Sequence, residues 1–175
     1  MTQNVPDFGA LLRSAERSAV HLEMRDSYMD DPVFADWRAG LPVDRPDAYD
    51  LPEEYQAWAA LVEETVARGV VMRRARIVSE PVTDYIRWEH AITARHNVAL
   101  GEQVRWLPRR LASDLALPGN DLWLIDDRLV LFHWFTGDGD WAGHDFNEDP
   151  TTVKMVSTSF EAVWERAVPH AQYTV

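Results

Sequence analysis

Hydrophobic positions in the first part of the chain predict three helices and one strand. A helix begins after Asp7, a residue type that caps helix N-termini, because the apolar side chains that follow recur every three or four positions. From Val20 the apolar period changes to two, which is typical of a short strand. Pro32 indicates the start of a second helix, and the periodic run Glu53–Arg68, followed by Gly69, predicts the third.

Residues 41–52 predict a surface connector, because they hold Pro42, Pro46 and Pro52 among aspartates. This segment is also the best internal boundary of the chain. Because 175 residues is an ordinary length for one domain, we expect a single domain over residues 1–175. The alternative is a subdivision into an N-terminal helical portion, residues 1–52, and an α/β core, residues 53–175.

The second half alternates strand-like and helix-like patterns. The predicted elements are a strand at 70–78, a helix at 81–98, a strand at 103–107, a hairpin of 122–125 and 129–135, a polar loop at 137–150 and a helix at about 151–168. Both hairpin strands are apolar on both faces, which indicates that at least one is central in a sheet. A strand–helix–strand unit favours parallel pairing across its helix.

The expected fold class is therefore α/β, with α+β as the alternative. We expect a mixed twisted sheet of about five strands flanked by helices.

Composition indicates an acidic, soluble, globular protein. The chain is 46% hydrophobic with eight tryptophans, and its formal net charge is −12. The longest apolar run, Leu129–Phe135, is far shorter than the roughly 20 residues of a membrane helix, and the N-terminus lacks a signal-peptide pattern. Because cysteine is also absent, we expect a cytoplasmic protein without membrane contact.

Positive charge is concentrated in one segment. Between Arg68 and Arg110, nine arginines and four acids give a charge of +5. Guanidinium groups suit phosphate or carboxylate ligands, and ligands of open α/β sheets bind near the carboxyl ends of strands. Either these arginines form a binding surface or they pair with the surplus acids of the same fold. The candidate binding residues are Arg74, Arg76, Arg105, Arg109 and Arg110.

Glu89 and His96 are the alternative, acid–base candidates. They are seven residues apart on the predicted 81–98 helix, so two turns bring them to one side. A carboxylate aligned with an imidazole can perform proton transfer, and the two can equally be structural polar residues. No H-E-x-x-H, P-loop, G-x-S-x-G or G-x-G-x-x-G motif accompanies them.

The loop Asp138, Asp140, His144 and Asp145 offers several metal ligands, but it lacks the closing glutamate of a calcium loop. Asp149 ends that window. We therefore expect no metal and no cofactor. His133, inside an apolar strand, is expected to be a hydrogen-bonded core histidine.

The chain resembles an uncharacterised actinobacterial domain family. The resemblance is carried by RRARIVSEPVTDYIRWEH, GEQVRWLPRR, ALPGNDLWLIDDRLVLFHWFTGDG and FEAVWERAVPH, and it extends to residues 8–12 and 37–40. Members are often encoded beside helix-turn-helix regulators with small partner proteins. The resemblance therefore implies a regulatory neighbourhood and no particular reaction.

The element order is also similar to one half of a phospholipase-D-like fold. Catalytic members of that superfamily carry His-x-Lys-x4-Asp, whereas the only lysine here, Lys154, has Thr152 two positions before it. The nucleophile of that chemistry is therefore missing. Degenerate members of the superfamily serve as ligand-sensing or partner-sensing domains in regulators.

These observations favour a non-enzymatic cytoplasmic binding domain in a regulatory system. It would recognise a protein partner, such as a helix-turn-helix regulator, or a small anionic ligand through the arginine-rich surface. The alternative is a hydrolase acting on a phosphorylated or nucleotide-like substrate, with Glu89 and His96 as acid–base groups. The negative net charge argues against direct nucleic-acid binding.

Overall fold

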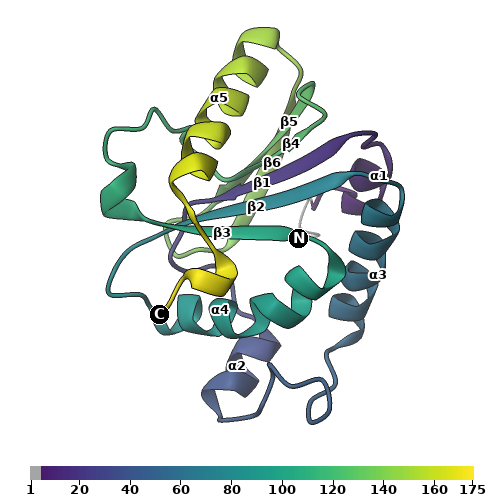
Figure 1. Cartoon of the computed structure of the whole chain (residues 1–175), viewed down its shortest axis with the longest axis vertical. Helices are drawn as coiled ribbons and strands as arrows, with labels where there is room; N and C mark the ends of the chain where they lie inside the picture. Colours follow the sequence, from purple (N-terminus) through teal and green to yellow (C-terminus); the bar gives the residue numbers. More distant parts are fainter. Residues whose placement is uncertain (1–4) are drawn as a thin grey trace.

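A computed structural model describes residues 5–175 as a mixed β-sheet with helices on both faces (Figure 1). In chain order the elements are α1 (Phe8–Arg13), β1 (Ser18–Glu23), α2 (Pro32–Arg38), α3 (Glu53–Ala67), β2 (Val71–Val78), α4 (Asp84–His96), η1 (Val98–Leu100), β3 (Gln103–Pro108), η2 (Arg109–Ala112), β4 (Leu122–Ile125), β5 (Leu129–Phe135), β6 (Trp141–Asn147), α5 (Pro150–Arg166), β7 (Val168–Pro169) and η3 (His170–Gln172).

The sheet has seven strands in the order β6-β5-β4-β1-β2-β3-β7. Strands β1, β2 and β3 are mutually parallel, and every other neighbouring pair is antiparallel. The predicted α/β class, the parallel pairing across the helix now labelled α4 and the hairpin of β4 and β5 are confirmed. The segment before Pro52 supplies α1, α2 and the central strand β1, which lies between β2 and β4.

The sheet exceeds the predicted five strands because two strands have weak local signals. Residues 137–150, predicted as a polar loop, contain β6, which pairs antiparallel with β5. Its sequence has no β-branched residue and includes Gly143 at φ +150°, so backbone pairing with β5 decides its conformation. The other addition, β7, is only two residues long and pairs with β3.

One face of the sheet packs on α5. Asp149 accepts hydrogen bonds from the backbone N–H groups of Thr151 (3.0 Å) and Thr152 (2.9 Å) and so caps this helix. A stripe at helical spacing, Val153, Val156, Phe160 and Val163, then lies against alternate residues of the strands. The fully buried Phe160 alone stabilises the fold by roughly 1.5–3 kcal/mol relative to exposure.

The opposite face is covered by two separate groups of helices (Figure 1). An apolar cluster under α1 and α3 contains Met72 and Trp123, and a second cluster under α2 and α4 contains Val78 and Trp106. Between them the strands present polar side chains on this face, namely His21, Glu23, Arg74, Arg76 and His133. The gap between the two apolar clusters is where the candidate site lies.

Within residues 5–175, none of the helices combines the length and the apolar character needed to span a membrane.

Candidate functional site

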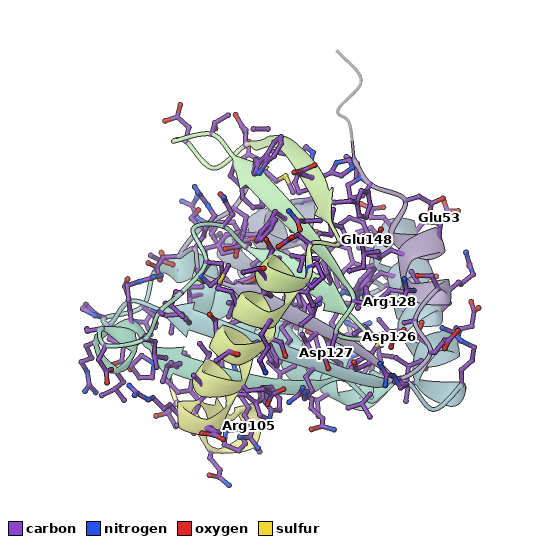
Figure 2. All side chains as sticks on the ribbon, turned by 90° about the horizontal axis from the view of Figure 1, so that it is seen from above. Glu53, Arg105, Asp126, Asp127, Arg128 and Glu148 are labelled. Carbon is purple, nitrogen blue, oxygen red and sulfur yellow. The ribbon has the colours of Figure 1, made fainter. Side chains whose placement is uncertain are left out.

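The five arginines singled out in the sequence occupy three separate places. Arg74 and Arg76 lie on the face of β2 that points away from α5, and both are buried. Arg105 lies on the other face, where its Nη1 donates to the backbone oxygen of Trp164 at 2.8 Å, beside the carboxyl end of α5 (Figure 2). The arginines alternate along β2, since Arg73 lies on the α5 face and contacts Phe160.

Arg109 and Arg110 follow the end of β3. Arg109 Nη2 donates to the backbone oxygens of Met24 (2.6 Å) and Ile77 (3.0 Å), so this side chain ties three strand ends together. The side chain of Arg110 is 70% exposed, and its Nε lies 3.4 Å from a carboxylate oxygen of Glu80. The five arginines therefore do not form one continuous surface.

Arg74 and Arg76 belong to a buried network of ion pairs. Glu23 accepts hydrogen bonds from Arg74 Nη1 and from Arg76 Nε. Arg74 Nε also donates to Glu102 at 2.9 Å, and Arg76 Nη1 donates to the Thr93 hydroxyl at 2.7 Å. Burial opposes ionisation of Glu23, but Arg76 and Arg74 together overcome it and hold its pKa well below the usual range.

This network forms the floor of a cavity on the sheet face between the two helical groups. The cavity has two neighbouring compartments, of about 260 and 420 Å³, which share part of their lining. The lining shared by both compartments is Phe8, His21, Met29, Tyr85, Glu89 and His133.

Aromatic rings make most of the walls. Trp123 stacks on His21 with ring centroids 4.3 Å apart, and Trp58 meets Trp123 edge-on at 6.1 Å. Phe8 meets His133 edge-on at 5.7 Å. The cavity thus combines flat apolar walls with a polar floor, which is typical of small-molecule sites.

Several buried polar atoms of this cavity have no hydrogen-bond partner among the described residues. They are His21 Nδ1, Trp88 Nε1, Glu89 Oε2, His96 Nδ1 and His133 Nε2. His21 Nδ1 lies 3.3 Å from Glu23 Oε1, but it makes no hydrogen bond of acceptable geometry. His133 was predicted to be a hydrogen-bonded core histidine: it is buried, but its Nε2 lacks a partner within residues 5–175.

Burial sets the protonation of these groups. It raises the pKa of Glu89 to about 7, although Arg76, with Nη2 3.5 Å from Oε1, acts in the opposite direction. Burial lowers the pKa of His96 to about 4, and Arg74 lowers it further. It likewise lowers the pKa of His133 to about 4. Near neutral pH the imidazoles are therefore uncharged, and Glu89 is divided between its acid and its carboxylate.

One end of the cavity holds a second carboxyl group, Asp121. It accepts hydrogen bonds from the Tyr28 hydroxyl and from the backbone N–H of Met24 (2.9 Å). Burial raises the pKa of Asp121 to about 6, although the Tyr28 hydrogen bond opposes the shift and the charge on Glu23 adds to it. Both oxygens of this side chain are thus already occupied.

The acid–base candidates Glu89 and His96 both line the larger compartment from α4. His96 packs on Tyr55 with ring centroids 4.7 Å apart. Within the part of the chain that the structure describes, no three histidine, aspartate or glutamate side chains gather in an arrangement that could hold a metal ion. The arrangement of groups can bind and orient a ligand, and it offers uncharged imidazoles and one carboxyl group for proton transfer.

Sequence reasoning missed His21, Glu23 and Glu102 as parts of the site. The signal for His21 and Glu23 is present in β1, where these two residues alternate with apolar residues that pack on α5. A central strand with polar residues at every second position indicates a buried polar face. The strand order that makes β1 central follows from tertiary pairing alone.

Fold and site together define an α/β domain with a mixed sheet and a partly polar cavity on one face. The chain belongs to the family described as "Domain of unknown function (DUF6879)", whose model matches residues 6–175. No curated protein matches the sequence.

Two solved structures are similar in fold. A phospholipase D family member, Nuc from Salmonella typhimurium, has a TM-score of 0.50 at 14% identity over 92% of this chain and 86% of that one. TrmBL2, an archaeal chromatin protein described with a novel mode of DNA binding, has a TM-score of 0.49 at 13% identity over 91% of this chain. The chain spans about half of TrmBL2, 48% of its length. At these identities the likeness to Nuc shows the fold alone.

Proposed function

We propose that this domain is a non-enzymatic binding domain that holds a small molecule in the cavity on the sheet face between the two groups of helices. The observation that carries the proposal is the set of buried polar atoms without partners, which belong to the residues lining that cavity. A buried polar group without a hydrogen bond costs roughly 1–3 kcal/mol. Several such groups in one cavity are explained if a ligand supplies their partners.

The buried arginines Arg74 and Arg76 line the floor of the cavity, but their charges are already paired within the protein. Glu23 and Glu102 accept hydrogen bonds from Arg74, and Glu23 also accepts one from Arg76. Two positive charges are thus compensated by two negative charges inside the protein. We therefore move the proposed binding surface from the five arginines to this cavity, which includes Arg74 and Arg76 but not Arg105, Arg109 or Arg110.

We further propose that the domain acts in the cytoplasm as part of a regulatory system. The support is the resemblance to a family encoded beside helix-turn-helix regulators. In this proposal the protein partner is such a regulator, and the occupied or empty state of the cavity changes the affinity between the two proteins. Exposed Arg110 remains available for that contact.

A thermal-shift screen of a small-molecule library tests the binding proposal. The matched control is Met29→Trp, because Met29 lines both compartments yet is 41% exposed, so a larger ring can fill the cavity at little cost in stability. We expect compounds that raise the melting temperature of the wild type and not of the variant. A library without any such compound refutes the proposal.

A hydrolase acting on a phosphorylated or nucleotide-like substrate is the second candidate, because Glu89 and His96 share one compartment. The wild type and Glu89→Gln are assayed with a panel of phosphoesters. Turnover that disappears in a folded Glu89→Gln protein supports the hydrolase. No turnover by the wild type supports the binding domain.

A further inference from the structure

We infer that the ligand of the cavity is an uncharged, flat heteroaromatic molecule, of the size of a nucleobase, with hydrogen-bond donors and acceptors on its edge. The inference deepens the proposed function and rests on it. Three properties of the cavity lead to it: the charge of its floor, the orientation of its rings and the kind of polar atoms left without partners.

The charge of the floor disfavours an ionic ligand. Arg74 and Arg76 are matched by Glu23 and Glu102, and Glu89 adds only further negative charge, so the floor has no net positive charge to attract an anion. Asp121, the carboxyl group at one end of the cavity, already accepts one hydrogen bond on each oxygen, which makes it a weaker partner for a cation than a carboxylate without hydrogen bonds.

The one carboxyl oxygen of this floor without a partner among the described residues is Glu89 Oε2. Its pKa of about 7 means that it exchanges between donor and acceptor near neutral pH. A group of this kind suits an uncharged polar ligand better than a fixed charge of either sign.

The walls favour a flat ligand. Trp123 and His21 are stacked with only 14° between their planes, while Trp58 and Phe8 approach the same region edge-on. Aromatic rings bind other rings by stacking or by edge-to-face contact. Compartments of about 260 and 420 Å³ suit one or two fused rings with small substituents.

The polar atoms favour a heterocycle over a hydrocarbon. His21 Nδ1 and His133 Nε2 belong to uncharged imidazoles, and each can donate or accept according to the tautomer. Their rings lie 5.7 Å apart, so one small molecule can reach both. A heteroaromatic ring with nitrogen and carbonyl or amino groups on its edge satisfies these atoms, whereas a hydrocarbon leaves them buried and unpaired.

Titration with free nucleobases tests the inference. Adenine, guanine, cytosine and uracil are compared at pH 7.5 with toluene, with tetramethylammonium and with inorganic phosphate. Trp58, Trp88, Trp123 and Trp141 line the cavity, so bound ligand changes tryptophan fluorescence, and calorimetry gives the affinity. The variants are Met29→Trp, which fills the cavity, and His133→Phe, which keeps a ring and removes Nε2.

We expect at least one nucleobase to bind, and Met29→Trp to abolish binding. His133→Phe should weaken binding by about tenfold or more, which corresponds to one lost hydrogen bond of about 1.4 kcal/mol. Circular dichroism and thermal melting confirm that each variant is folded.

Two results overturn the inference in distinguishable ways. Binding of the ammonium ion, phosphate or toluene that Met29→Trp abolishes, without binding of any nucleobase, refutes the ligand class and leaves the binding domain in place. If no probe and no library compound binds in a manner that depends on Met29, the proposed function itself is refuted.

Discussion

Replacing Glu89 with glutamine should stabilise the protein at alkaline pH and have little effect at acid pH. Glu89 is a buried carboxyl group whose Oε2 has no partner within residues 5–175. Its pKa rises from 4.5 to about 7 on folding, chiefly because burial disfavours the charged form. Between these two values the folded state binds more protons than the unfolded state, so its stability falls as the pH rises.

The size of the effect follows from the shift. One pKa unit corresponds to about 1.4 kcal/mol, so the cost of ionised Glu89 reaches about 3 kcal/mol at pH 8. At pH 5 the loss of stability caused by Glu89 is below about 1 kcal/mol, because the Glu89 carboxyl is still protonated in the folded state. Glutamine keeps the shape and carries no charge. We therefore expect Glu89→Gln to gain about 1–3 kcal/mol at pH 8.

Urea denaturation of both proteins at pH 5 and pH 8, followed by circular dichroism, measures this difference. Glu23→Gln is the control, and it should destabilise the protein where Glu89→Gln stabilises it. The pKa of Glu23 lies below its usual value because its charge pairs with Arg74 and Arg76. Breaking that pair should cost roughly 3–5 kcal/mol at both pH values, because both lie above the unfolded pKa of 4.5, and the loss should shrink only at more acid pH. Equal destabilisation by Glu89→Gln at both pH values would show that Glu89 is a paired structural carboxylate and refute the reasoning.

Three further changes test the packing around the site by thermal or urea unfolding. Arg109→Gln should lower the free energy of unfolding by about 1–3 kcal/mol, because the backbone oxygens of Met24 and Ile77 lose their donor. The exposed Arg110→Gln should change it by less than about 0.5 kcal/mol. Equal losses in the two variants would contradict the contacts of Arg109. Asp126→Ala should cost at least about 2 kcal/mol and Asp126→Asn less, because the carboxylate accepts hydrogen bonds from the backbone N–H groups of residues 16–18. Gly101→Ala should cost about 1–2 kcal/mol, since φ is +97° and a Cβ would lie 2.9 Å from Val66 Cγ1; an unchanged midpoint would contradict this.

Local pattern was sufficient for most of the secondary structure. The apolar stripe of α5 and the alternation along β2 are visible in the sequence, because one face of each must be buried against another element. The strand β6 was missed because its residues have little strand propensity, and pairing with β5 imposes its extended backbone. No local pattern carries that information.

The arginines show where local reasoning stops. Arg74, Arg76 and Arg105 lie in the predicted strands 70–78 and 103–107, but the sequence could not tell whether they face solvent or the interior. The structure places Arg74 and Arg76 beside Glu23, from a strand about fifty residues earlier, and Arg74 also beside Glu102. A charge can be buried when its partner is brought close, and that partner comes from elsewhere in the chain.

The sequence by itself determined the class of fold, because helical and strand periods depend only on neighbouring residues. It also determined that the chain lacks the lysine-containing motif of catalytic phospholipase D members. Tertiary structure alone decided that β1 is central and that His21 and His133, more than a hundred residues apart, lie in one cavity. The physical reason is that burial, protonation and the lack of a hydrogen-bond partner depend on which distant segments pack together.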